Sequence, residues 1–169
     1  CFRVFSDGLD RRARRREVLE EDLREALVSG VSVAVHFQPQ VSATGELIGA
    51  EALFRWKHPK FGDIPASEAI EIAEESDLII TLGNFVFRDC AIFARRFPHL
   101  SVAINVSPEQ FSRNENLADE LRETARLEGV DPAQIELEIT ESVFMASDNR
   151  PDVQRGAWRD HGFRLALDI

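Results

Sequence analysis

The sequence LSVAIN, residues 100–105, is a short apolar run that ends in an asparagine. Its length and its valine and isoleucine content indicate a buried strand. IELEIT at 135–140 and FRLALD at 163–168 have the same strand-like form, and helical patterns separate the three segments. Strands that alternate with helices predict a largely parallel sheet joined by crossover helices. These segments therefore place the chain in the α/β class.

The segments around these strands extend the pattern. VSVAVHFQ at 31–38 and LIGAEALFRW at 47–56 are separated by the turn SATGE at 42–46, which predicts an antiparallel hairpin. Asn114 is expected to cap one of the following helices, and Gly129 is expected to end it. Helices are expected over 65–75, 82–97, 114–128 and 148–161.

A separate helical pattern covers the first part of the chain. Leu19, Leu23 and Leu27 repeat on one face of a helix, and Gly30 follows its end. Five arginines precede four glutamates along this helix: Arg11, Arg12, Arg14, Arg15 and Arg16, then Glu17, Glu20, Glu21 and Glu25. This run favours a solvated face with i,i+4 ion pairs over a membrane or nucleic-acid patch. We expect a connecting helix over 8–30.

Composition limits the classes of function. The 169 residues are 44% hydrophobic and 30% charged, as in a globular protein, and no apolar run reaches the roughly 20 residues of a membrane helix. The net charge of −10 argues against binding a nucleic-acid polymer. Cys1 and Cys90 lack metal-type spacing, so we expect a reducing, cytoplasmic location. The only methionine is Met145, so we expect a piece of a longer protein, whose own membrane anchor would lie in other segments.

Four oxygen-bearing residues lie at comparable places in successive strands. Glu51 lies in the second strand, and Asn105, Glu138 and Asp168 follow at or near strand ends, the last two steps being 33 and 30 residues. Side chains from successive strand ends meet at one mouth of a (β/α) barrel. Such an all-oxygen set suits Mg²⁺ or Mn²⁺ and not zinc. Taken singly, these residues are better explained as strand glutamates on a solvent face, a turn-forming asparagine and an aspartate near a terminus. Only the four together favour a site.

Five motifs in order resemble those of the EAL domain, a bacterial family of cyclic di-GMP phosphodiesterases. They are QPQV (38–41), EALFRW (51–56), INVSPEQF (104–111), ELEITES (136–142) and LALD (165–168). The resemblance implies an incomplete, modified TIM-like barrel over 31–169 and metal-dependent hydrolysis of cyclic di-GMP to pGpG. FRVFSDGLD, at the start of the chain, resembles the tail of a GGDEF domain, which we expect to occupy 1–7 upstream of the connecting helix.

The resemblance also implies roles for individual residues. Gln38, Leu53 and Arg55 match contacts to the dinucleotide, and Glu141 matches a catalytic-site residue that steadies a loop. A two-metal site of Mg²⁺ or Mn²⁺ is implied for Glu51, Asn105, Glu138 and Asp168, of which the three carboxylates are also the catalytic residues.

The match departs from the family after Asp168. Family members continue with Asp-Phe-Gly and supply a lysine and a glutamate later, whereas Ile169 follows here. We therefore expect these residues alone to bind cyclic di-GMP weakly and not to hydrolyse it. The alternatives are a non-catalytic EAL-like module that binds cyclic di-GMP or a protein partner, and an unrelated metal-dependent barrel enzyme. A homodimer formed through the barrel is a further expectation.

Overall fold

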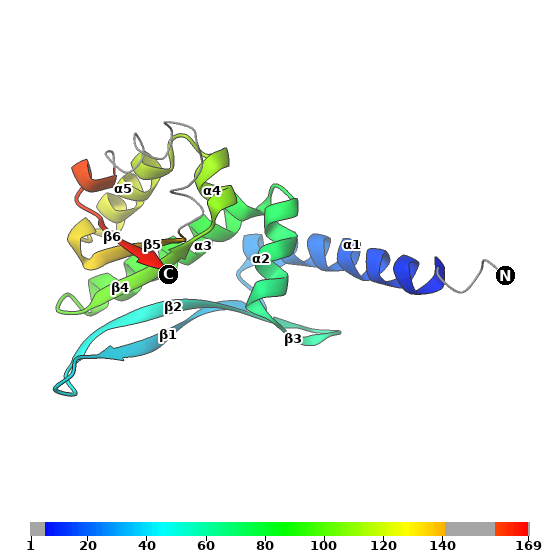
Figure 1. Ribbon diagram of the computed structural model, residues 1–169, viewed down its shortest axis with the longest axis horizontal. Helices are drawn as coiled ribbons and strands as arrows, with labels where there is room; N and C mark the ends of the chain where they lie inside the picture. The colour runs from blue at the N-terminus through cyan, green and yellow to red at the C-terminus, as the bar shows by residue number, and fades with distance from the viewer. Residues whose placement is uncertain (1–5, 141–157, 169) are drawn as a thin grey trace.

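The computed structural model describes residues 6–140 and 158–168. It begins with a long helix, continues with a hairpin, and then alternates helices and strands (Figure 1). The elements are α1 (Ser6–Ser29), β1 (Val33–Val41), β2 (Leu47–His58), β3 (Gly62–Ile64), α2 (Ala66–Glu75), α3 (Leu78–Arg96), β4 (Ser101–Val106), α4 (Pro108–Arg113), α5 (Leu117–Glu128), a short 3-10 helix (Pro132–Gln134), β5 (Ile135–Thr140) and β6 (Arg164–Asp168).

A six-stranded sheet forms the centre of the fold, in the order β1-β2-β4-β5-β6, with β3 paired to β2. Strands β1 and β2 are antiparallel, as the hairpin prediction requires, and β2, β4, β5 and β6 are parallel. The α/β prediction is therefore confirmed. Within the described residues the sheet is open, since β1 and β6 each have one neighbour, which agrees with an incomplete TIM-like barrel.

The hydrophobic core lies on one face of this sheet. Along β2, Ala52, Phe54 and Trp56 are buried, whereas the residues between them are not, because successive side chains point to opposite faces. Helix α3 packs on the buried face through residues such as Phe87 and Cys90. The hairpin runs along one side of the molecule, and the helices lie to one side of it (Figure 1). The opposite face of the sheet is consequently left open.

Helix α1 covers 8–29 of the residues 8–30 over which a helix is expected, and its role as a connection to an upstream domain stays a prediction. Its leucines Leu19, Leu23 and Leu27 are buried in the same core as the strands. Its charged face forms ion pairs both within the helix, as between Arg24 and Glu20, and with α2, where Arg15 pairs with Glu68. Helix α1 is therefore packed against the domain that follows it from Arg15 onward, while the turns before Arg15 project away (Figure 1).

Two helix predictions need correction. The helix expected at 82–97 begins at Leu78, because Leu78 and Ile79 are buried and extend its apolar face. The helix expected from Asn114 is preceded by a separate one, α4, and Asn114 is the C-cap of α4 and not the N-cap of α5. Ser107 supplies the side-chain cap of α4.

Other expectations are confirmed or lie outside the described residues. Helix α2 has the predicted extent, and Gly129, with φ of 69°, ends α5 in the left-handed conformation that favours glycine. Of the helix expected at 148–161, residues 148–157 are not described, and 158–160 are helical. The GGDEF-like tail expected at 1–7 falls mostly outside the described residues and stays a prediction.

Candidate functional site

The sheet register brings most of the predicted site residues to one face. Gln38 of β1 lies directly opposite Glu51 of β2, and Asn105 of β4 lies opposite Glu138 of β5. Glu51 lies opposite Ala103, two residues before Asn105, so Glu51 and Asn105 point to the same side of the sheet. This is the open face, opposite the helices.

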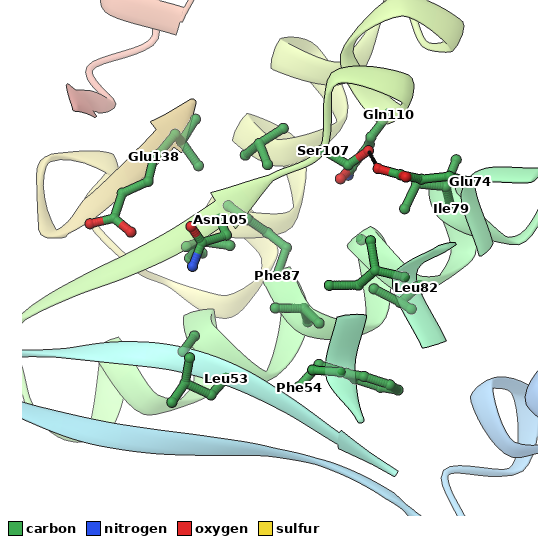
Figure 2. A pocket seen from close by; sticks show the side chains of 18 of the residues that line it. Leu53, Phe54, Glu74, Ile79, Leu82, Phe87, Asn105, Ser107, Gln110 and Glu138 are labelled. Carbon is green, nitrogen blue, oxygen red and sulfur yellow. Dashed lines mark hydrogen bonds between the residues drawn. The ribbon is translucent and has the colours of Figure 1, made fainter. Parts of the chain in front are cut away.

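A direct hydrogen bond joins two of these residues. The Nδ2 of Asn105 donates to Oε1 of Glu51 over 3.0 Å, across 54 residues of sequence. Glu138 is on the strand next to Asn105, with its side chain partly exposed. In Figure 2 the polar ends of Asn105 and Glu138 point away from the apolar side chains of Phe87 and Leu82. The structure thus groups three of the four predicted metal ligands on adjacent strands.

The fourth predicted ligand is placed only by its backbone. Asp168 ends β6, opposite Thr140 and two residues beyond the position opposite Glu138. Its side chain, like the whole of Glu141, lies outside the described residues. Among the side chains that are described, no three His, Cys, Asp or Glu residues form a group that could hold a metal ion. The metal centre therefore stays a prediction, as does the loop-steadying role of Glu141.

The predicted dinucleotide contacts follow one another along the open face. Leu53 and Arg55 alternate with the buried Ala52 and Phe54, and they project to the same side as Glu51. Arg55 is exposed, and its Nη1 donates to the carbonyl oxygen of Phe54 over 2.9 Å. The rest of its guanidinium fork offers further donors, a geometry that suits a phosphate group.

A cavity of about 300 Å³ lies where β2 and β4 diverge. The two strands pair only as far as Ala52 and Ile104, and residues of helices α2, α3 and α4 line the cavity beyond that point. Its wall combines apolar side chains with Asn105 and Glu138 from the open face (Figure 2). Arg55 also lines it. The cavity therefore adjoins the residues that the sequence assigned to the site.

Three polar residues near this cavity were missed by the sequence reasoning: Glu74, Ser107 and Gln110. The Ser-Pro pair before α4 was a usable signal for Ser107, because serine is a favoured N-cap and proline a favoured first helical residue. Glu74 had no such signal, since its partner is 33 residues away in the sequence.

Residues 20–169 match the family described as EAL domain, and the chain therefore belongs to the EAL domain family. The match covers the open face described above and the second half of α1. Within the described residues, none of the helices combines the length and the apolar character that crossing a bilayer requires.

Two curated proteins are similar to this chain over most of its length. An uncharacterized signaling protein of Caulobacter vibrioides is 38% identical over 169 residues, which is 99% of this chain and 21% of that protein. The cyclic di-GMP phosphodiesterase PdeR of Escherichia coli is 32% identical over 151 residues, 87% of this chain and 22% of its own length. The chain thus spans about a fifth of these relatives.

Among solved structures, the PaMucR phosphodiesterase in complex with c-di-GMP superposes with a TM-score of 0.82 and 29% identity. The superposition covers 89% of this chain and 62% of that one. The chain therefore shares the fold of the PaMucR phosphodiesterase over 89% of this chain's residues.

Proposed function

We propose that this chain is part of a phosphodiesterase domain that hydrolyses cyclic di-GMP to pGpG in bacterial second-messenger signalling. The observation that carries the proposal is the row of polar residues on the open face, with Asn105 bonded to Glu51 beside Glu138. Its support from comparison is that PdeR is named a cyclic di-GMP phosphodiesterase and that the PaMucR phosphodiesterase structure contains c-di-GMP.

The donor chemistry of this face fits a hard divalent cation. Glu51 and Glu138 offer carboxylate oxygens, Asn105 offers an amide oxygen, and Asp168 ends the neighbouring strand. Oxygen ligands of this kind suit Mg²⁺ or Mn²⁺, which we propose these four residues would hold. Two such ions, when bound, would activate a water molecule and neutralise charge at the phosphate.

The other site residues would bind and orient the dinucleotide. Arg55 can direct two parallel N–H donors at one phosphate, which a lysine could not do. Gln38, which lies opposite Glu51, would form hydrogen bonds with polar atoms of the dinucleotide. Leu53 would pack against an apolar surface of the dinucleotide. Glu141 would steady the adjoining loop.

We also propose the layout of the longer protein. A GGDEF-like tail would occupy 1–7, a connecting helix 8–30 and the EAL domain 31–169. The division is supported by Gly30, whose φ of 69° ends α1 before β1 starts. A cytoplasmic location and a homodimer formed through the barrel belong to the same proposal, and sedimentation velocity would test the dimer.

Cyclic di-GMP binding provides the first test of the site. Calorimetry with Mn²⁺ should detect weak binding to the 169-residue chain, and Glu51→Ala should lower the affinity by at least about tenfold, since loss of a ligand weakens the metal site that holds the phosphate. The matched control is Glu46→Ala, an exposed glutamate in the hairpin turn, which should bind as the wild type does. Equal affinity in wild type and Glu51→Ala would contradict the proposal.

Chromatographic detection of pGpG separates an enzyme from a binding module. In the longest natural chain that contains these residues, we expect hydrolysis that Glu51→Ala abolishes. Binding without hydrolysis in that chain would instead identify a non-catalytic cyclic di-GMP module. Substantial pGpG formation by the 169 residues alone would overturn our expectation that this chain does not hydrolyse the dinucleotide.

A further inference from the structure

A network of polar side chains follows Asn105 at the end of β4, on the side that faces α2 and α4. Two residues after Asn105, the hydroxyl of Ser107 donates to Oε1 of Glu74 over 2.7 Å and accepts the backbone N–H of Glu109 over 3.1 Å (Figure 2 shows the first bond). The first bond crosses from the end of β4 to the last turn of α2. Ser107 is thereby held from both sides.

Arg113 binds the same helix end from α4. Its Nη2 donates to the carbonyl oxygen of Glu74 over 2.7 Å, and its Nη1 donates to that of Ser76 over 3.0 Å. These carbonyls belong to the C-terminal end of α2, where backbone acceptors lack intrahelical donors. Side chains at the two ends of α4, Ser107 and Arg113, therefore bind the C-terminal end of α2.

The ladder between β4 and β5 pairs Asn105 with Glu138, but the ladder between β4 and β2 does not reach Asn105. Pairing of β4 with β2 ends at Ile104, so Asn105 is one residue beyond the last paired position. On that side its amide contact with Glu51 is a side-chain bond of 3.0 Å. The turn that Ser107 anchors begins two residues after Asn105.

We propose that Glu74 is a positioning residue for the candidate metal site. Through Ser107 it fixes the turn after β4 and so holds the Asn105 amide at Glu51. Glu74 does not itself need to touch metal or substrate, because its carboxylate is bonded to Ser107 and partly buried. This inference rests on the proposed function and adds a residue from α2, an element that supplies none of the predicted ligands.

The first experiment measures Mn²⁺ affinity by calorimetry and stability by urea unfolding in the 169-residue chain. Glu74→Ala should weaken Mn²⁺ binding by about tenfold, the lower end of what loss of a residue supporting a metal ligand causes. Glu74→Gln keeps an oxygen acceptor for Ser107 and should recover affinity to within about threefold. The matched control is Glu75→Ala, which removes an exposed partner of Arg16 from the same helix turn.

A double-mutant cycle shows whether Glu74 acts through Ser107. The Glu74→Ala/Ser107→Ala double variant should bind Mn²⁺ no more weakly than Ser107→Ala alone, because both changes remove one link. Additive losses would overturn the proposal, because they would show that Glu74 acts independently of Ser107. Unchanged Mn²⁺ affinity in Glu74→Ala, with binding lost in Glu51→Ala, would overturn it while leaving the proposed function intact.

A second readout does not depend on metal binding. In nuclear magnetic resonance spectra of the metal-free chain, the side-chain amide signals of Asn105 should shift in Glu74→Ala and return towards wild type in Glu74→Gln. Signals that stay unmoved in Glu74→Ala would overturn the inference, even if the wild-type chain bound no Mn²⁺ and the proposed function itself had failed.

Discussion

At the scale of single residues, the structure gives His58 a defined role. The imidazole is buried at the end of β2, and its Nδ1 accepts the backbone N–H groups of Lys60 and Phe61 over 3.0 and 3.1 Å. An accepting Nδ1 carries no proton, so Nε2 donates to Asp22 of α1 over 2.8 Å. One histidine thus joins α1, β2 and the turn before β3.

Replacement of His58 should therefore destabilise the fold. His58→Ala should lower the free energy of unfolding by about 2–3 kcal/mol, because it leaves two backbone donors and the Asp22 carboxylate without this partner. Urea unfolding followed by circular dichroism would measure the loss. The exposed His99 provides the control, since His99→Ala should change stability by less than about 0.5 kcal/mol. Equal losses in both variants would contradict the proposed role.

A second residue-scale constraint concerns Gly83 in α3. A Cβ added there would overlap the side-chain amide of Gln110, which is buried against the helix. Gly83→Ala should therefore destabilise the chain, although alanine is the better helix former by about 1 kcal/mol. The comparison with Gly83→Ala/Gln110→Ala in thermal unfolding tests the cause. Stability should recover in the double variant, and no recovery would show that the contact is not responsible.

At the scale of elements, α1 contacts the domain through buried leucines and through arginines that pair with α2. Leu19 and Leu23 have no exposed surface and extend the core of the domain. The arginines of the preceding turns reach α2, with Arg15 bonded to Glu68 and Arg16 paired to Glu75 over 2.5 Å. Helix α1 is therefore docked on α2 and β2, the strand that carries Glu51. Its position is fixed by apolar burial, with exposed ion pairs adding little.

Truncating one buried leucine of α1 tests this view. Leu23→Ala should lower the free energy of unfolding by about 2–5 kcal/mol, because a cavity is left in the shared core. Val28, on the same helix, is 81% exposed, and Val28→Ala should cost less than about 0.5 kcal/mol. Chemical denaturation of both variants would measure the two changes in the free energy of unfolding. A Leu23→Ala chain as stable as wild type would show that α1 is a tether outside the cooperative unit.

At the scale of the whole molecule, the two faces of the sheet differ in polarity and in role. One face is apolar and buried under the helices, and stability resides there. The other carries two directly opposite pairs, Gln38 with Glu51 and Asn105 with Glu138, and the candidate chemistry resides there. The side-chain alternation of strands allows one set of strands to serve both needs, because neighbouring residues never compete for the same face.

The reactivity of the Cys90 thiol measures whether the core around α3 stays closed. The thiol is buried in α3, and burial raises its pKa, so that almost none is thiolate at neutral pH. In a Cys1→Ser variant, Ellman's reagent should leave the folded chain almost unmodified and should react once urea exceeds the unfolding midpoint. A thiol that reacts quickly in the absence of denaturant would show that the core around α3 opens readily.

Much of the architecture was predictable from local pattern. The apolar strands at 100–105, 135–140 and 163–168, the hairpin and the α/β class follow from short-range periodicity, and the structure confirms them. The misplaced start of α3 and the extra helix α4 show the weakness of this approach, because burial of Leu78 and capping by Ser107 decided those boundaries. The family motifs named the site residues, and the register brought several of them together.

The sequence by itself determined which residues carry the candidate chemistry, because residue type and order along the strands are local properties. Only the tertiary structure decided that Asn105 donates to Glu51, that β2 and β4 diverge beyond Ala52, and that Glu74 reaches Ser107. These contacts join segments 33 or more residues apart, and the packing of helices against the sheet sets their geometry. No pattern along one strand or helix contains that information.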